Sequence, residues 1–212
     1  MKNKKELIKL LFFISAVVAF MLLLIYDTVG FVRFMEAFHK VRHGFADFIT
    51  GPLPLIRDTL LLIYSIINLL NVLKKKKRKS AIDPLETSVL VFVGLAFFTG
   101  IYEIVLFIGK ATASVVEYDI LSLVIGILLI VAFVIGGVSV LKNENLKMKK
   151  LLAFIAVGLV CLCFFVLFVR VFIAMFSGFS GMLLFLLFTY LAVIGLSVLE
   201  GLYLKSYEFE EE

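Results

Sequence analysis

Six long apolar runs, separated by short polar connections, constrain this chain more than any other feature of its sequence. The hydrocarbon core of a bilayer is about 30 Å thick, so a helix of about 20 apolar residues is long enough to cross it. Of the 212 residues, 63% are hydrophobic and 17% are charged, and the mean hydropathy is +1.14. Water-soluble domains are about half apolar, so this composition indicates a protein that is solvated by lipid.

Each run is continuously apolar and lacks the alternation of polar and apolar residues that is typical of strands in a membrane barrel. We therefore predict an all-α integral membrane protein, with residues 1–212 forming a single polytopic membrane domain. The first run is too long for a signal peptide and has no small-residue cleavage pattern, so we expect it to be retained. The predicted crossings are residues 7–30, 55–73, 84–109, 118–141, 151–175 and 182–204.

Basic residues gather at alternate connections between the crossings. If the N-terminus lies inside the cell, 15 of the 21 lysine and arginine residues fall in cytoplasmic segments. The positive-inside rule therefore places both termini in the cytoplasm, and we expect the membrane to be a prokaryotic plasma membrane.

The run from Lys74 to Lys79 is interpreted as a topology anchor that contacts anionic lipid headgroups. A nucleic-acid site would need a broader basic surface than this short connection provides, so no nucleic-acid partner is expected.

Between the first two crossings, residues 31–50 repeat apolar side chains at three- and four-residue steps, the period of one helix face. We predict an amphipathic helix that lies in the outer membrane interface. Its polar face carries Glu36, His39, His43 and Asp47 in one stripe, which are weak candidates for a divalent metal site. A solvated polar face explains the same stripe, and neighbouring basic residues disfavour a cation, so we expect no metal.

Ionisable side chains within the crossings are the main candidates for a functional site. Each costs about 2.5–3.5 kcal/mol on insertion scales and therefore needs a partner or water. Asp27, Glu103 and Arg170 fall at similar depths in the outer half of the bilayer, counted at about 1.5 Å per helical residue. We predict that Glu103 lies near Arg170, with Asp27 or Asp119 as a second carboxylate partner, in a polar binding site. A structural ion pair, or an arginine that extends to the headgroups, would account for the same residues.

Small residues share helix faces with some of these polar groups, and in lipid such residues mark close helix contacts. We expect these faces to look toward the interior of the bundle. Glu200, near the end of the sixth crossing, is instead expected at the inner interface. The predicted inward faces are Ala96, Thr99, Gly100 and Glu103 on the third crossing, Asp119, Ser122 and Gly126 on the fourth, and Ala156, Cys163, Arg170 and Ala174 on the fifth.

The sequence contains no nucleophile elbow, no P-loop and no glycine-rich phosphate loop. We therefore expect neither an enzyme nor a bound cofactor. An enzyme acting on lipid would have only the His39 and His43 pair as a source of acid–base chemistry.

The sequence predicts a small transport or channel-type component for an unidentified solute or ion. The main alternative is a non-catalytic structural or assembly subunit of a larger membrane complex. Other membrane subunits, or further copies of this chain, are partners compatible with both functions.

Overall fold

The computed structural model describes residues 2–38, 49–73, 84–112, 120–141, 146–178 and 180–206. Within these ranges the chain forms six helices and no strand. All six are long and apolar enough to cross a membrane, which confirms the predicted fold class. The helices are α1 (Lys2–Phe38), α3 (Leu53–Leu73), α4 (Pro84–Thr112), α5 (Ile120–Leu141), α6 (Leu146–Ser177) and α7 (Gly181–Ser206).

The first helix continues beyond the predicted end of the first crossing. Instead of ending at Gly30, α1 runs for 37 residues to Phe38. A single glycine within a helix costs only about 1 kcal/mol relative to alanine, so Gly30 alone does not stop the helix. One turn later, Arg33 Nη1 donates to Met182 Sδ of α7 at 3.2 Å, which holds the extension beside α7. Residues 31–38 therefore belong to α1, whereas 39–48 lie outside the described residues and their interfacial helix stays a prediction.

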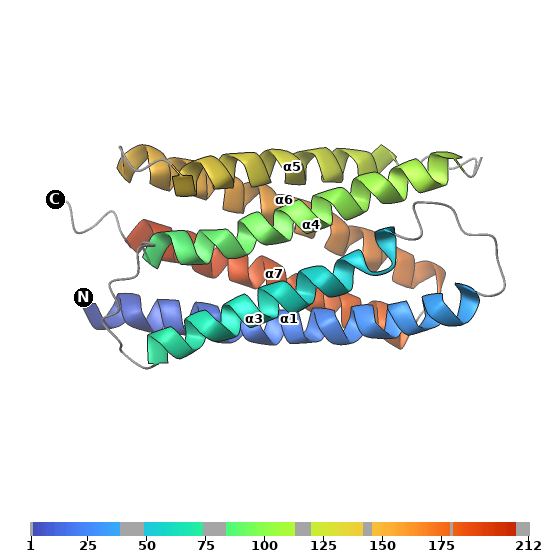
Figure 1. Cartoon of the computed structure of the whole chain (residues 1–212), viewed down its shortest axis with the longest axis horizontal. Coiled ribbons are helices and arrows are strands. Elements are labelled where there is room, and N and C mark those ends of the chain that lie inside the picture. The colour runs from blue at the N-terminus through green and yellow to red at the C-terminus, as the bar shows by residue number, and fades with distance from the viewer. Residues whose placement is uncertain are drawn as a thin grey trace.

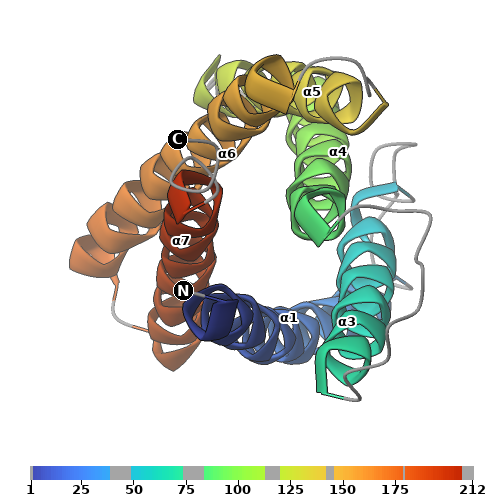
Figure 2. The same cartoon turned by 90° about the vertical axis from the view of Figure 1, so that its left-hand side faces the viewer.

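The helices run roughly along one long axis, with α1 beginning and α7 ending on the same side of the bundle (Figure 1). Viewed along that axis, they form a ring in chain order (Figure 2). Each helix packs against the next, and α7 packs back against α1. In addition to its ring neighbours, α4 contacts α6 and α7, so it lies toward the middle of the bundle.

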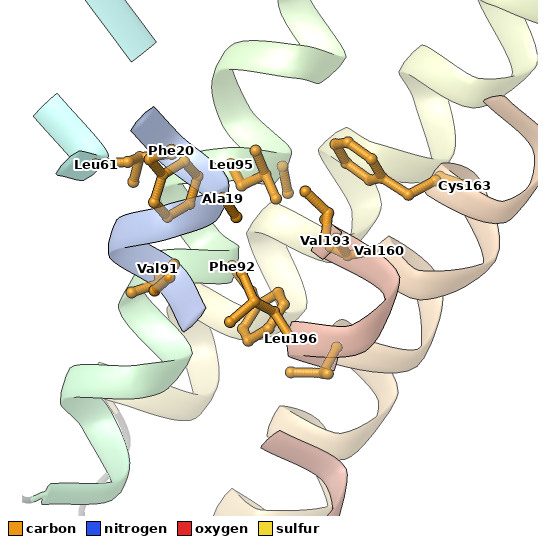
Figure 3. Close-up of a cluster of buried hydrophobic side chains, with 14 of the residues drawn as sticks. Ala19, Phe20, Leu61, Val91, Phe92, Leu95, Val160, Cys163, Val193 and Leu196 are labelled. Carbon is orange, nitrogen blue, oxygen red and sulfur yellow. The ribbon is translucent and has the colours of Figure 1, made fainter. Parts of the chain in front are cut away.

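Apolar side chains from all six helices fill the interior, and Figure 3 labels some of those from α1, α3, α4, α6 and α7. The largest are Phe12, Phe13, Phe20, Phe92 and Phe164, each at most 1% exposed. The Phe12 ring lies 5.2 Å from that of Phe13 and 5.9 Å from that of Phe92, measured between centroids. Because lipid tails are as apolar as these side chains, close packing rather than exclusion of water holds the layer together.

Glycines allow α4 and α5 to approach with their backbones almost in contact. A Cβ atom on Gly126 would lie 2.7 Å from Ile104 Cγ1 and 3.1 Å from the carbonyl oxygen of Gly100. A Cβ atom on Gly100 would in turn lie 3.2 Å from the carbonyl oxygen of Gly126. The small-residue faces predicted to look inward on these two helices are buried, as expected.

Glu200 of α7 is a correction to the sequence prediction. Its side chain is fully buried rather than interfacial, at 0% exposure. Ser88 Oγ of α4 donates to Glu200 Oε1 at 2.7 Å, and Lys9 of α1 is close enough to interact with the carboxyl group electrostatically. Its position near a helix end suggested the interface, but α7 turns this face toward α4.

Candidate functional site

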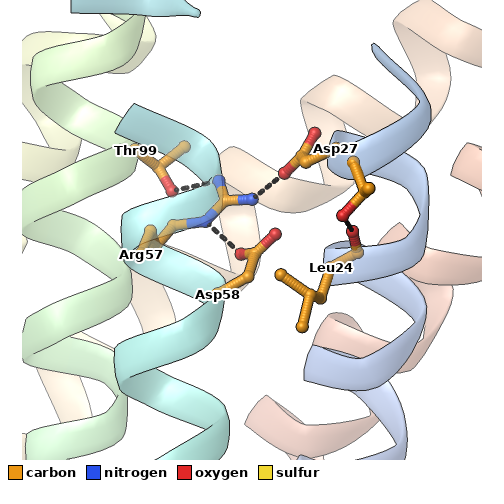
Figure 4. A network of polar contacts seen from close by, with 6 residues as sticks. Leu24, Asp27, Arg57, Asp58 and Thr99 are labelled. Atoms are coloured by element: carbon orange, nitrogen blue, oxygen red, sulfur yellow. Dashed lines mark hydrogen bonds and ion pairs between the residues drawn. The ribbon is translucent and has the colours of Figure 1, made fainter. Parts of the chain in front are cut away.

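One buried arginine connects three helices near the end of the bundle opposite the start of α1 (Figure 4). Arg57 lies one turn inside α3 and is 6% exposed. Its Nη2 donates to Asp27 Oδ2 of α1 at 2.8 Å, and its Nε donates to Asp58 Oδ1 at 2.6 Å. The remaining nitrogen, Nη1, donates to Thr99 Oγ1 of α4 at 3.2 Å. A guanidinium group this deeply buried requires such charged and hydrogen-bonding partners.

The local sequence explains how α3 positions this arginine. Pro54 stands in the first helical turn, where its missing amide hydrogen breaks no helical hydrogen bond. Arg57 and Asp58 follow within the next turn, so α3 carries a guanidinium and a carboxylate into the bundle at adjacent positions. Because consecutive helical residues are rotated by about 100°, Asp58 points toward α1 while the longer Arg57 side chain also reaches α4.

Asp27, Arg57 and Asp58 together carry a formal charge of −1 when all three are ionised. Asp58 is fully buried, at 0% exposure, and is engaged with the Arg57 side chain. The Asp27 side chain retains 15% exposure and lines a cavity. Asp27 is therefore the carboxylate of this group that a ligand could reach.

The cavity, which we call the main cavity, has a volume of about 300 Å³ and lies between α1, α3, α4, α6 and α7. This is at the lower end of the range for small-molecule pockets, about 300–1,000 Å³. Glu103 in its wall is 5% exposed, and half-buried Arg170 donates from Nη1 to Ser122 Oγ at 3.1 Å. The polar residues of the lining are Tyr26, Asp27, Arg57, Thr99, Tyr102, Glu103, Arg170 and Tyr190.

Three of the four residues predicted as binding groups, Asp27, Glu103 and Arg170, line this one cavity. The fourth, Asp119, lies outside the described residues. Sequence analysis did not identify Arg57 or Asp58 as site residues, because Arg57 was counted among the basic residues of the outer connections. The available signal was an adjacent base and acid two residues inside the predicted crossing 55–73.

The structure describes only one of the four weak candidates for metal ligands. Glu36 is exposed near the end of α1, whereas His39, His43 and Asp47 lie outside the described residues. The run from Lys74 to Lys79, the predicted contact with anionic headgroups, also lies outside them. Metal and lipid contacts at these positions therefore stay predictions.

Comparison with models of known protein families, with curated proteins and with solved structures finds no match to this chain. Its class follows from the helices themselves. All six described helices meet the length and hydropathy of a membrane crossing. The protein is thus a multi-pass α-helical integral membrane protein.

Proposed function

We propose that this protein is a small membrane transport component that binds a charged solute in the main cavity. The observation that supports this function is the gathering of ionisable side chains around one space within an apolar bundle. Each such group costs about 2.5–3.5 kcal/mol in a crossing, so the gathering of several around one cavity supports a role in binding. The groups are Asp27, Arg57, Glu103 and Arg170 in the cavity wall, with Asp58 behind Arg57.

The packing of the interior favours a carrier over a permanently open channel. Toward the end where α1 begins, Phe12, Phe13, Phe92 and Leu196 fill the interior and are each at most 1% exposed. A solute in the main cavity is therefore separated from that end by a tightly packed apolar layer. Passage would require the helices to rearrange around the bound solute, as in alternating access.

The charge pattern supports a direction for this binding. The largest basic groups of the sequence belong to connections at the end opposite the cavity, and such groups favour the cytoplasmic side. The main cavity would then open toward the outer half of the membrane. A solute would enter it from outside the cell, with carboxylate and guanidinium groups available to replace its hydration.

Flux through the purified protein in vesicles tests this function. The full chain is reconstituted, and uptake of radiolabelled choline, glutamate, glycine and sorbitol is compared with uptake by protein-free vesicles. We expect at least one charged or zwitterionic probe to enter faster than in protein-free vesicles, and sorbitol not to. The Glu103→Gln variant should lower that uptake about tenfold or more, because one charge–dipole contact in a dry site contributes more than 1.4 kcal/mol.

The matched control is Glu6→Gln, the same substitution at an exposed position near the start of α1. It should leave uptake within experimental error of the original chain. If no probe enters faster than in protein-free vesicles, the transport function is wrong and an assembly subunit becomes the better interpretation. Equal uptake by the Glu103→Gln variant and the original chain would likewise contradict a role for the main cavity.

A further inference from the structure

A second cavity lies beside the main one, and we call it the aromatic cavity. Its volume is about 270 Å³, and it lies between the last turns of α1, the residues that lead into α3, and α4. The two cavities share Tyr26, Asp27, Pro54 and Tyr102 in their linings. Asp27 therefore stands at the boundary between them, with one face toward each space.

The lining of the aromatic cavity has an unusual composition. It includes four aromatic rings, from Tyr26, Phe31, Phe34 and Tyr102, together with the Asp27 carboxylate. The centroids of the Phe31 and Phe34 rings are 6.2 Å apart. Among the described residues that line this cavity there is no lysine or arginine. Aromatic faces carry partial negative charge, so rings and a carboxylate together favour a cation over an anion.

The neighbouring charges strengthen this preference. Arg57 contacts both aspartates, and Asp58 already matches its single positive charge at 2.6 Å. With both aspartates ionised the group carries a formal charge of −1, and Asp27, at the wall of the aromatic cavity, is its accessible carboxylate. The nearest basic residue on the described part of α1, Arg33, donates to Met182 on α7 and also acts electrostatically on Tyr26 of the lining.

We propose that the aromatic cavity binds the alkylammonium group of a small organic cation. The ammonium group would lie among the four aromatic rings of the lining, with the Asp27 carboxylate as its counter-ion. A quaternary ammonium group fits this lining best, because it is weakly hydrated and has no N–H that would need an acceptor. The rest of the molecule would extend past Asp27 into the main cavity. The inference rests on the proposed function, since it names the class of solute that the site accepts.

Calorimetric binding of two probes of equal shape tests the proposal. Choline carries a trimethylammonium group, and 3,3-dimethylbutan-1-ol has the same shape with carbon in place of nitrogen. Both are titrated into the full chain in lipid nanodiscs. We expect choline to bind about tenfold or more tightly than the alcohol, because only the cation gains from ring faces and carboxylate. Equal affinities, or binding of neither probe, would overturn the proposal.

Ring substitutions locate the binding. The Phe34→Leu variant keeps an apolar side chain but loses the ring, so choline affinity should fall about 2- to 30-fold. The Phe34→Tyr variant keeps the ring and should change affinity by about twofold or less. Phe172→Leu, at a 47% exposed position on α6, is the matched control and should leave affinity unchanged. If Phe34→Leu does not fold, Phe31→Leu serves as the second variant.

Unchanged choline affinity in the folded ring variant would place the cation elsewhere and overturn the proposal. The outcome is distinguishable from failure of the proposed function. Choline binding without uptake of any probe would retain the ligand site and reject transport. Uptake of glutamate or glycine that depends on Glu103, without choline binding, would retain transport and reject the organic cation.

Discussion

The Arg57 side chain helps to fix the arrangement of the three helices that it contacts. Each of the three nitrogen atoms of the Arg57 guanidinium donates a hydrogen bond, with donor–acceptor distances of 3.2 Å or less. The acceptors are Asp58 of its own helix, Asp27 of α1 and Thr99 of α4. Its planar fork fixes the direction of each hydrogen bond, which a lysine at the same position could not do. The position of α3 relative to α1 and α4 is therefore determined by directional bonds as well as by packing.

We predict that replacing Asp58, the fully buried partner of Arg57, destabilises the protein more than replacing Asp27. The Asp58→Ala variant should lower the free energy of unfolding by about 3–5 kcal/mol, because it leaves a buried charge with a more distant counter-ion. Asp27→Ala is the matched comparison and should cost less, since Asp58 remains and Asp27 is partly exposed. Denaturant titration of the reconstituted chain measures both, and an equal or larger loss for Asp27→Ala would contradict the prediction.

Sequence analysis could place residues by depth but could not pair them. Asp27, Glu103 and Arg170 were grouped because the rise of a helix gives the depth of each residue directly. The partner of Asp27 depends on the rotation of α3 about its own axis, and a mostly apolar helix gives little sequence signal for that rotation. The pairing of Asp27 with Arg57 was therefore not predicted, even though Arg57 lay inside the predicted crossing.

Among the helices, α4 and α5 illustrate a contact that sequence alone does reveal. Gly100 and Gly126 were predicted to lie on inward faces because small residues permit close approach in lipid. The structure places the two glycine backbones against each other. The end of α1 was harder to predict, because Gly30 weakens a helix only slightly and no proline follows before Pro52.

We predict that two glycine substitutions in the same helix act in opposite directions. Gly126→Ala should lower the free energy of unfolding by about 1–3 kcal/mol, since the new methyl group meets α4 backbone that cannot move aside. Gly137→Ala, where nothing lies within 4 Å of the added atom, should raise it by at most about 1 kcal/mol through helix propensity. Thermal unfolding in detergent measures both, and similar effects would rule out the close contact.

For the whole molecule, the lengths of the apolar runs predicted the membrane-crossing helices directly. The orientation of the bundle in the membrane is inferred from the distribution of charge alone. α3 and α5 end on the side of the bundle opposite the main cavity, and the basic connections follow them in the sequence (Figure 1). If the basic end is cytoplasmic, as the positive-inside rule indicates, the site faces outward. Under the proposed function, the lysines that orient the chain would also decide which compartment supplies the solute.

Cysteine labelling tests this orientation. In a background with Cys161 and Cys163 replaced by alanine, the Gly178→Cys variant should react with a membrane-impermeant maleimide in intact cells. Gly178 is exposed in the connection between α6 and α7. Lys76→Cys should react only after the membrane is permeabilised, because its segment is expected inside. The reverse pattern would invert the topology and place the main cavity on the cytoplasmic side.

The closure of the ring between α1 and α7 has a consequence for biosynthesis. Of the described helices, α7 leaves the ribosome after all the others, and until then α1 has lipid where its neighbour will be. Leu183, Leu186 and Tyr190, which form one wall of the main cavity, arrive with α7. In a nascent chain that has inserted the other five helices the ring is consequently still open, and the main cavity is enclosed only when α7 packs against α1.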